Sequence, residues 1–244
     1  MERRVYARMG EVEDRHWWFV ARRRILAAVL ERSALLPRPA RVLEAGCGTG
    51  GNLGMLSRFG AVRAFEPDTE ARGKAARRNH CEISDGALPG RVPFAGERFD
   101  LVAVLDVLEH LDDDEGALRA LAERLQPGGL ILVSVPAYAF LWSRHDVAHH
   151  HKRRYTRASL LAVARAAGFE PVSVSYFNTL LFPLIVVRRM LGRLFALKGD
   201  DDAMPPLWLN RLLGAVFAFE RRLVGRWRLP FGVSLLMLAR KPGR

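Results

Sequence analysis

The sequence predicts an α/β protein with a doubly wound, mostly parallel sheet of seven strands and helices on both faces. Apolar segments of strand length alternate with segments of helical periodicity along most of the chain. A glycine-dense turn at residues 46–51 joins the first strand to a helix, which is typical of the opening unit of a nucleotide-binding fold. Strands are expected at 41–43, 61–66, 81–85, 99–106, 130–135, 169–177 and 233–239.

Helical periodicity fills the stretches between these strands. The expected helices are 13–36, one starting at 53, 68–79, 115–125, 157–167, 179–198 and 207–226. Pro37 and Pro39 end the first of them. The pattern divides the chain into an N-terminal helical cap (1–40), a sheet domain (41–178 plus 231–244) and a helical insertion (179–230).

The first helix begins with the aromatic cluster His16–Phe19, followed by the three arginines 22–24. An amphipathic helix that packs on the sheet is the preferred interpretation of this cluster. The alternative is an aromatic lid over a bound ligand.

Composition and charge restrict the class of protein. The chain carries a net charge of +12, with +5 in residues 1–41, +8 in 176–244 and −1 between them. Such basic flanks favour an anionic partner, either nucleic acid or a membrane surface. Arginine far outnumbers lysine, so a GC-rich coding background is an alternative cause. Two cysteines, a charged N-terminus and no apolar run near ~20 residues favour a cytoplasmic protein.

The glycine turn is the first candidate ligand site. Gly46, Gly48 and Gly50 allow a tight turn and a close approach of a ligand to the backbone. Gly46, Gly48 and Gly51 also satisfy G-x-G-x-x-G, with Glu66 at the distance of a ribose-binding acid. The motif alone therefore leaves a dinucleotide as an alternative cofactor.

Three predicted strands end in an acid, namely Glu66, Asp85 and Asp106. In an open parallel sheet, ligands bind at the carboxyl ends of the strands, so these carboxylates are expected along one crevice. Caps for the following helices are the alternative role of such acids.

Over residues 40–178 the sequence resembles the class I S-adenosylmethionine-dependent methyltransferases. The similarity rests on residues 43–50, 99–110 and 125–129 together with Glu66 and Asp85-Gly86. It implies a Rossmann-like fold, S-adenosylmethionine as cofactor, Glu66 on the ribose, Asp85 at the adenine amino group and no metal. The implied cofactor-binding residues are Glu44, Gly46, Cys47, Gly48, Gly50, Glu66, Asp85, Gly86 and Asp106.

Residues 135–155 follow the fifth strand and should lie over the transferred methyl group. Their pattern of His-Asp, then a histidine and Arg-Arg-Tyr-Thr, resembles a bacterial subgroup of these enzymes often found with cell-envelope glycan or lipid-carrier genes. By that match the candidate catalytic residues are His145, Asp146, His151 and Tyr155. A histidine here would take the proton of a hydroxyl acceptor. Solvated histidines at a helix N-cap, or a metal site, are alternatives.

The acceptor is expected to be a hydroxyl of a small molecule, a lipid or a lipid-linked glycan. A nucleic-acid methyltransferase is the competing interpretation, but Leu105–Leu108 is not the Asn/Asp-Pro-Pro-Tyr motif of DNA amino-methylating enzymes. A non-catalytic cofactor-binding scaffold is a third, which the intact first motif disfavours.

The insertion at 179–230 contains two basic amphipathic helices. Such helices suit the surface of an anionic bilayer, which predicts a peripheral position at the inner face of the plasma membrane. A hairpin that packs on the domain or on a second subunit is the alternative.

Overall fold

The computed structural model describes residues 3–194 and 203–243. The end of the helix predicted over 179–198 and the break predicted at Asp200–Asp202 lie outside these residues. The helices are α1 Arg3–Val12, α2 Trp17–Ser33, α3 Leu53–Leu56, α4 Thr69–Arg77, α5 Asp114–Ala122, α6 Arg144–Ala148, α7 Arg157–Ala166, α8 Phe182–Leu194 and α9 Leu207–Phe219, with short 3₁₀ helices η1 Leu108–His110, η2 Ala139–Leu141 and η3 Glu220–Arg222. The strands are β1 Ala40–Ala45, β2 Gly60–Phe65, β3 Ile83–Ser84, β4 Phe99–Leu105, β5 Leu125–Pro136, β6 Glu170–Phe177 and β7 Ser234–Arg240.

The seven described strands form one sheet in the order β3-β2-β1-β4-β5-β7-β6. β7 pairs antiparallel with both β5 and β6, whereas the other pairs are parallel. The sheet is therefore mixed, and the prediction of a mostly parallel sheet holds for every strand except β7. The strand order reverses direction between β1 and β4, which makes the carboxyl ends of these two strands the expected place for a ligand.

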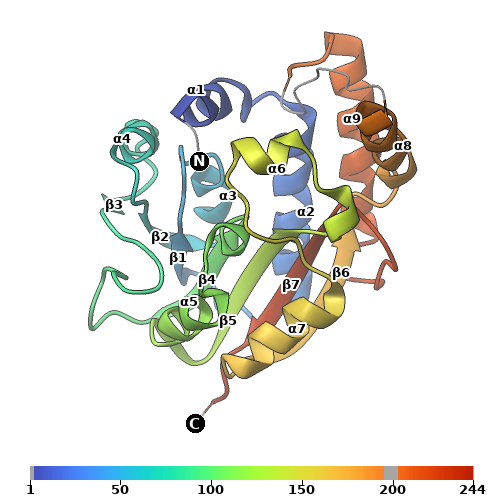
Figure 1. The fold of residues 1–244 in the computed structure, drawn as a ribbon. Coiled ribbons are helices and arrows are strands. Elements are labelled where there is room, and N and C mark those ends of the chain that lie inside the picture. Colours follow the sequence, from blue (N-terminus) through green and yellow to red (C-terminus); the bar gives the residue numbers. More distant parts are fainter. Residues whose placement is uncertain (1–2, 195–202, 244) are drawn as a thin grey trace.

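Helices cover both faces of the sheet (Figure 1). Successive side chains of a strand point to opposite faces, so Val42 joins one apolar core and Leu43 joins the other. The first core includes residues of α2, α3 and α9, and the second includes residues of α5 and α7. This arrangement is the doubly wound architecture predicted from the alternation of strands and helices.

The N-terminal region differs from the single helix predicted over 13–36. α2 begins only at Trp17, because His16 is in an extended conformation and its Nδ1 accepts a hydrogen bond from the amide of Trp18 at 3.3 Å. A separate helix, α1, precedes it. As preferred from the sequence, α2 packs on the sheet through a buried face that includes Ile25 and Leu26.

The start of β5 and the end of α9 also differ from the prediction. β5 starts at Leu125 and runs through the predicted turn at 126–129, with a register shift opposite Phe99. The helix predicted over 207–226 ends at Phe219 and continues as η3. Glu220, which opens η3, is buried, and its carboxylate accepts hydrogen bonds from the amides of Asn178 and Leu180, each at 2.7 Å.

Within residues 3–194 and 203–243, no helix combines the length and apolar character needed to cross a bilayer.

Candidate active site

One cavity of about 380 Å³ lies where β1 and β4 end. The glycine turn and the residues after β4 form part of its wall, and α1, the start of α2, residues 136–154 and α8 contribute the rest. Of the predicted cofactor-binding residues, Gly46, Cys47, Gly48, Glu66 and Asp106 line this cavity. Glu44, Gly50, Asp85 and Gly86 are not among its lining residues.

The glycine turn is shaped for close contact with its surroundings. Gly46 and Gly48 have φ of 69° and 55°, which side-chain-bearing residues rarely adopt. A Cβ at Gly46 would lie 2.9 Å from Cγ2 of Val107, and one at Gly51 would lie 2.1 Å from Oε2 of Glu13. Glycine is therefore required here by both conformation and space.

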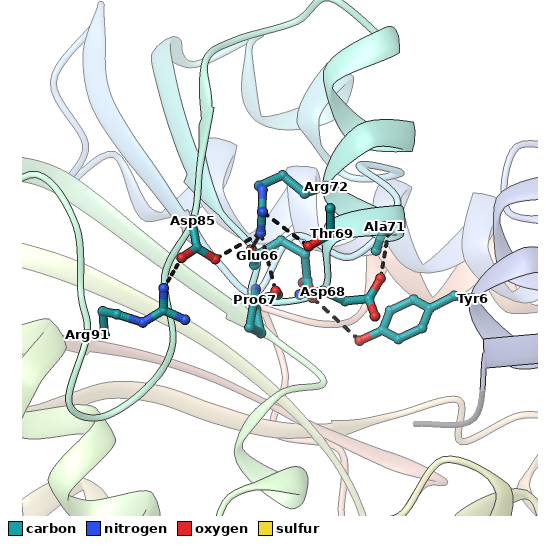
Figure 2. A network of polar contacts seen from close by, with 9 residues as sticks. All are labelled: Tyr6, Glu66, Pro67, Asp68, Thr69, Ala71, Arg72, Asp85 and Arg91. Carbon is teal, nitrogen blue, oxygen red and sulfur yellow. Dashed lines mark hydrogen bonds and ion pairs between the residues drawn. The ribbon is translucent and has the colours of Figure 1, made fainter.

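Glu66 is buried just after β2, and its carboxylate binds the backbone of the glycine turn. Its Oε2 accepts a hydrogen bond from the amide of Gly48 at 2.9 Å. Its Oε1 accepts one from the amide of Asp68 at 3.1 Å and lies 3.4 Å from the hydroxyl of Tyr6 (Figure 2). Burial raises the pKa of Glu66, and the backbone donors partly oppose that effect. The carboxylate borders the cavity, where a ribose diol could take the weak contact now made by Tyr6.

Asp85 faces a different set of partners. Its carboxylate forms ion pairs with Arg72, at 2.9 Å, and with Arg91, and its side chain is half-exposed (Figure 2). Arg72 also donates to the main-chain oxygen of Glu66 at 2.8 Å, so Asp85 is connected to the cavity wall through one arginine. A Cβ on the next residue, Gly86, would lie 2.6 Å from Cδ of Pro93. The role of Asp85 at an adenine amino group stays a prediction.

Glu44 lies within the core beside the turn. Burial raises the pKa of Glu44 to about 8. Its Oε1 accepts a hydrogen bond from Nδ2 of Asn52 at 2.9 Å, and its Oε2 has no hydrogen-bond partner among the described atoms. Glu44 therefore positions Asn52, which itself lines the cavity.

Asp106, after β4, is paired with an arginine from the N-terminal region. Arg22 is buried in α2, and its Nη2 lies 2.6 Å from Oδ2 of Asp106 and 2.8 Å from Oγ of Ser134. The pair joins the helical cap to the centre of the sheet at the cavity wall. The sequence analysis did not assign Arg22 to the site, although it lies on the same helical face as Ile25 and Val29.

Asp146 is the most enclosed acid of the cavity region. Its Oδ1 lies 2.8 Å from Nδ1 of His151 and 2.7 Å from Nε of Arg154, and its Oδ2 accepts from Nη2 of Arg154 at 3.0 Å and from the amide of Ser143 at 2.7 Å. Although burial alone would raise the pKa of Asp146, the hydrogen bonds from His151 and Arg154 hold it well below its usual range. The carboxylate is thus ionised, and Nδ1 of His151 donates to it.

Four histidines lie together on this wall of the cavity, namely His110, His145, His149 and His151. The ring centroids of His110 and His151 are 4.7 Å apart, and those of His145 and His149 are 3.9 Å apart. Burial lowers the pKa of His110 to about 3 and also lowers that of His151. The imidazoles of His110 and His151 that face the cavity are therefore neutral near pH 7.

The carboxyl group of Glu109 and the hydroxyl group of Tyr155 lie near the histidines. Glu109 is buried at the cavity, and burial raises its pKa. Tyr155, a predicted catalytic residue, is buried and donates its hydroxyl to Oδ2 of Asp114 at 2.7 Å. Tyr155 is not among the residues that line the cavity, so its hydroxyl serves the packing of the segment after β5.

The α1 helix supplies cavity residues that the sequence analysis missed. Tyr6, Met9 and Glu13 line the cavity from this side. Glu13 is buried and accepts from the hydroxyl of Thr49 at 2.6 Å and from Nη2 of Arg78 at 2.6 Å. In the sequence, Val5, Tyr6, Met9 and Val12 recur at helical spacing, and this signal could have predicted the helix. Its position depends on these contacts with the glycine turn.

Comparison with known proteins gives the family. A family model described as a methyltransferase domain matches residues 17–174. The chain belongs to this family of methyltransferase domains. The match makes S-adenosylmethionine its cofactor, as predicted, and the glycines and the Glu66 carboxylate at the cavity fit such a group.

Individual relatives agree with this assignment. The ubiquinone biosynthesis O-methyltransferase of Cereibacter sphaeroides is 35% identical over 118 residues, which are 45% of this chain and 47% of that protein. The enzyme of the same name from Methylocella silvestris is 35% identical over 163 residues, covering 57% of this chain and 62% of that protein. The chain thus spans about half of the first of these relatives and somewhat more of the second.

Solved structures show the same fold. The N-methyltransferase NodS from Bradyrhizobium japonicum, in complex with S-adenosyl-L-homocysteine, aligns with a TM-score of 0.56 at 15% identity, over 92% of this chain and 87% of that one. The shared feature is the Rossmann-like sheet with its helices.

Proposed function

We propose that this methyltransferase domain transfers a methyl group to the hydroxyl of an apolar acceptor, a lipid or a lipid-linked glycan. The observation that carries the proposal is the position of His151, which is paired with Asp146 behind it, on the same cavity as the cofactor turn. The relatives named O-methyltransferases support an oxygen acceptor. The resemblance to the cell-envelope subgroup supports a lipid or lipid-linked substrate.

When bound, S-adenosylmethionine supplies a methyl group already activated on a sulfonium. The protein then has to hold donor and acceptor in line and to accept the hydroxyl proton. In this proposal the turn at 46–48 and Glu66 hold the cofactor. Asp146 keeps Nδ1 of His151 protonated, so Nε2 carries the lone pair that receives the proton from the acceptor hydroxyl.

The apolar character of the acceptor follows from α8. Ile185, Arg188 and Arg189 of this helix border the cavity. Between and beyond these positions, Leu184, Val187, Met190 and Leu191 of α8 are exposed to solvent. An acceptor with an apolar tail could lie along this helix while its hydroxyl reaches the histidines.

The neighbouring helix makes an anionic bilayer surface the proposed partner. α9 and the residues after it expose Leu207, Trp208, Leu212, Phe219 and Trp227, together with several arginines: Arg211, Arg221, Arg222, Arg226 and Arg228. Apolar side chains at the acyl boundary and arginines at the headgroups fit an anionic membrane.

The acceptor class is tested by incubating the protein with methyl-labelled S-adenosylmethionine and bacterial extracts divided into lipid, aqueous and nucleic-acid fractions. We expect label in the lipid fraction and an ether product stable to mild base. His151→Gln should lower kcat by roughly a hundred-fold while the affinity for the cofactor stays within two-fold.

His150→Gln is the matched control, because His150 is exposed and is not among the cavity residues. Label confined to nucleic acid, or equal kcat for the His151 and His150 variants, would contradict the proposal.

A further inference from the structure

The histidine cluster has the arrangement of ligands around a metal ion. His145, His149 and His151 each offer one ring nitrogen, and these nitrogens all lie within 4.8 Å of one another. A tetrahedral zinc ion holds nitrogen ligands at ~2.0–2.1 Å, which places them about 3.3 Å apart. Small rotations of the three rings would close the difference.

The spacing of the ligands along the chain fits this geometry. His145 lies on α6 and His149 follows its last residue, four positions later, so both rings point to the same side of the helix. Their ring centroids, 3.9 Å apart with the ring planes tilted by 31°, agree with that placement. Two histidines at i and i+4 on one helix are a recurrent zinc-binding unit.

The third ligand is oriented by a buried carboxylate. Asp146 is fully buried and receives Nδ1 of His151 at 2.8 Å. Arg154 and the amide of Ser143 fix the carboxylate in turn. A carboxylate that orients a histidine in this way leaves Nε2 directed to a metal, and such second contacts are typical of zinc sites.

The groups around the cluster include a buried carboxyl group with one oxygen that has no hydrogen-bond partner among the described atoms. Glu109 is buried on the same wall, and its Oε2 has no hydrogen-bond partner among the described atoms. The positive charge of Arg154 is balanced by Asp146. A cation at the three histidines would favour the ionised form of Glu109, which also lines the cavity.

We propose that His145, His149 and His151 bind one divalent transition-metal ion of the zinc class and leave a fourth coordination position open to the cavity. Three protein ligands with one open position are typical of catalytic sites. In the ion-bound protein Nε2 of His151 would be a ligand and would no longer accept the proton; an acceptor hydroxyl at the open position would have its pKa lowered by the ion and would lose its proton to solvent. This last point rests on the proposed function, whereas binding of the ion does not.

The test uses the full chain without an affinity tag, stripped with a chelator and titrated with Co²⁺ and then Zn²⁺. We expect one ion per chain, with the visible absorption bands of tetrahedral Co²⁺ that Zn²⁺ abolishes. His149→Ala should weaken Co²⁺ binding by a hundred-fold or more, and Asp146→Asn by roughly ten- to a hundred-fold. His150→Ala should bind Co²⁺ like the unaltered protein.

Calorimetric titration with S-adenosylmethionine checks that each variant is folded. It also distinguishes a failure of the metal site from a failure of the proposed function, because cofactor binding does not depend on the ion. Absence of stoichiometric Co²⁺ binding by a protein that binds S-adenosylmethionine would overturn the metal site alone. So would equal losses in the His149 and His150 variants. If Glu109→Gln abolished binding while His149→Ala did not, the ion would belong to Glu109, His110 and His151 instead.

Discussion

At the level of single residues, buried acids with dedicated partners build the wall of the cavity. Glu66 binds the glycine turn, Asp106 binds Arg22, and Asp146 binds His151 and Arg154. The sequence predicted the three acids, because two of them end strands and the third lies in a motif. It did not predict Arg22 or Arg154 as their partners. Arg22 and Asp106 are far apart in the chain, so only the tertiary fold brings them together.

The acid at the centre of the histidine wall should control the acid stability of the protein. Asp146 has a folded-state pKa below the unfolded value of about 3.9, so its stabilising effect is complete above that pH and is lost as the pH falls further. Asp146→Asn removes the carboxylate and leaves Arg154 buried without a counter-charge. We expect this change to lower the free energy of unfolding by about 3–5 kcal/mol at pH 7.

Urea denaturation at pH 7, 5 and 3 measures the effect. The gap between Asp146→Asn and the unaltered protein should be constant from pH 7 to 5 and should narrow at pH 3. Asp112→Asn is the control, because this side chain is 86% exposed and pairs only at the surface. A gap that widens at pH 3 would contradict the ionised state of Asp146.

At the level of elements, the alternation of strands and helices predicted the sheet, because buried strands and amphipathic helices leave periodic patterns in the sequence. α1 left such a pattern too, at Val5, Tyr6, Met9 and Val12, but the sequence analysis did not use it. This helix is held by Glu13, Tyr6 and Met9 against the glycine turn, and those contacts depend on the folded domain. The early start of β5 at Leu125 depends likewise on its pairing with β4, and the end of α9 at Phe219 is followed by the contacts of Glu220 with Asn178 and Leu180.

Because α1 borders the cavity at the cofactor turn, its loss should speed cofactor release. We expect a protein that lacks residues 1–12 to release S-adenosylmethionine about ten-fold faster, which corresponds to ~1.4 kcal/mol. Stopped-flow displacement measures this rate. Glu11→Ala is the control, since Glu11 is an exposed residue of the same helix. An unchanged release rate after truncation would show that α1 does not retain the cofactor.

At the level of the whole molecule, the positive charge and the exposed apolar side chains coincide on the insertion that contains α8 and α9. The sequence predicted that this part of the chain is basic and amphipathic. The pattern does not distinguish a bilayer from a second subunit as its partner, because both present apolar surfaces. Each arginine near an anionic surface contributes about 1 kcal/mol, and salt screens that attraction.

We therefore expect the protein to co-sediment with vesicles rich in phosphatidylglycerol, and less so as salt rises. The double variant Trp208→Ser, Trp227→Ser should reduce binding at least ten-fold, because both side chains are more than two-thirds exposed. Val172→Ser, an exposed apolar residue of β6, should bind like the unaltered protein. Equal binding to neutral and anionic vesicles, or an unaffected double variant, would favour a subunit contact for this surface.

The central claim is that S-adenosylmethionine binds at the glycine turn with its ribose on Glu66, and calorimetric titration tests it most directly. The protein should bind one S-adenosylmethionine per chain and should bind NAD far more weakly. Glu66→Ala should weaken S-adenosylmethionine binding about ten-fold or more, because a hydrogen bond to a charged group contributes ~1.5–3 kcal/mol. Glu123→Ala, which changes a side chain that is 74% exposed, should leave the affinity unchanged. Tighter binding of NAD, or equal S-adenosylmethionine affinities for the Glu66 and Glu123 variants, would contradict the claim.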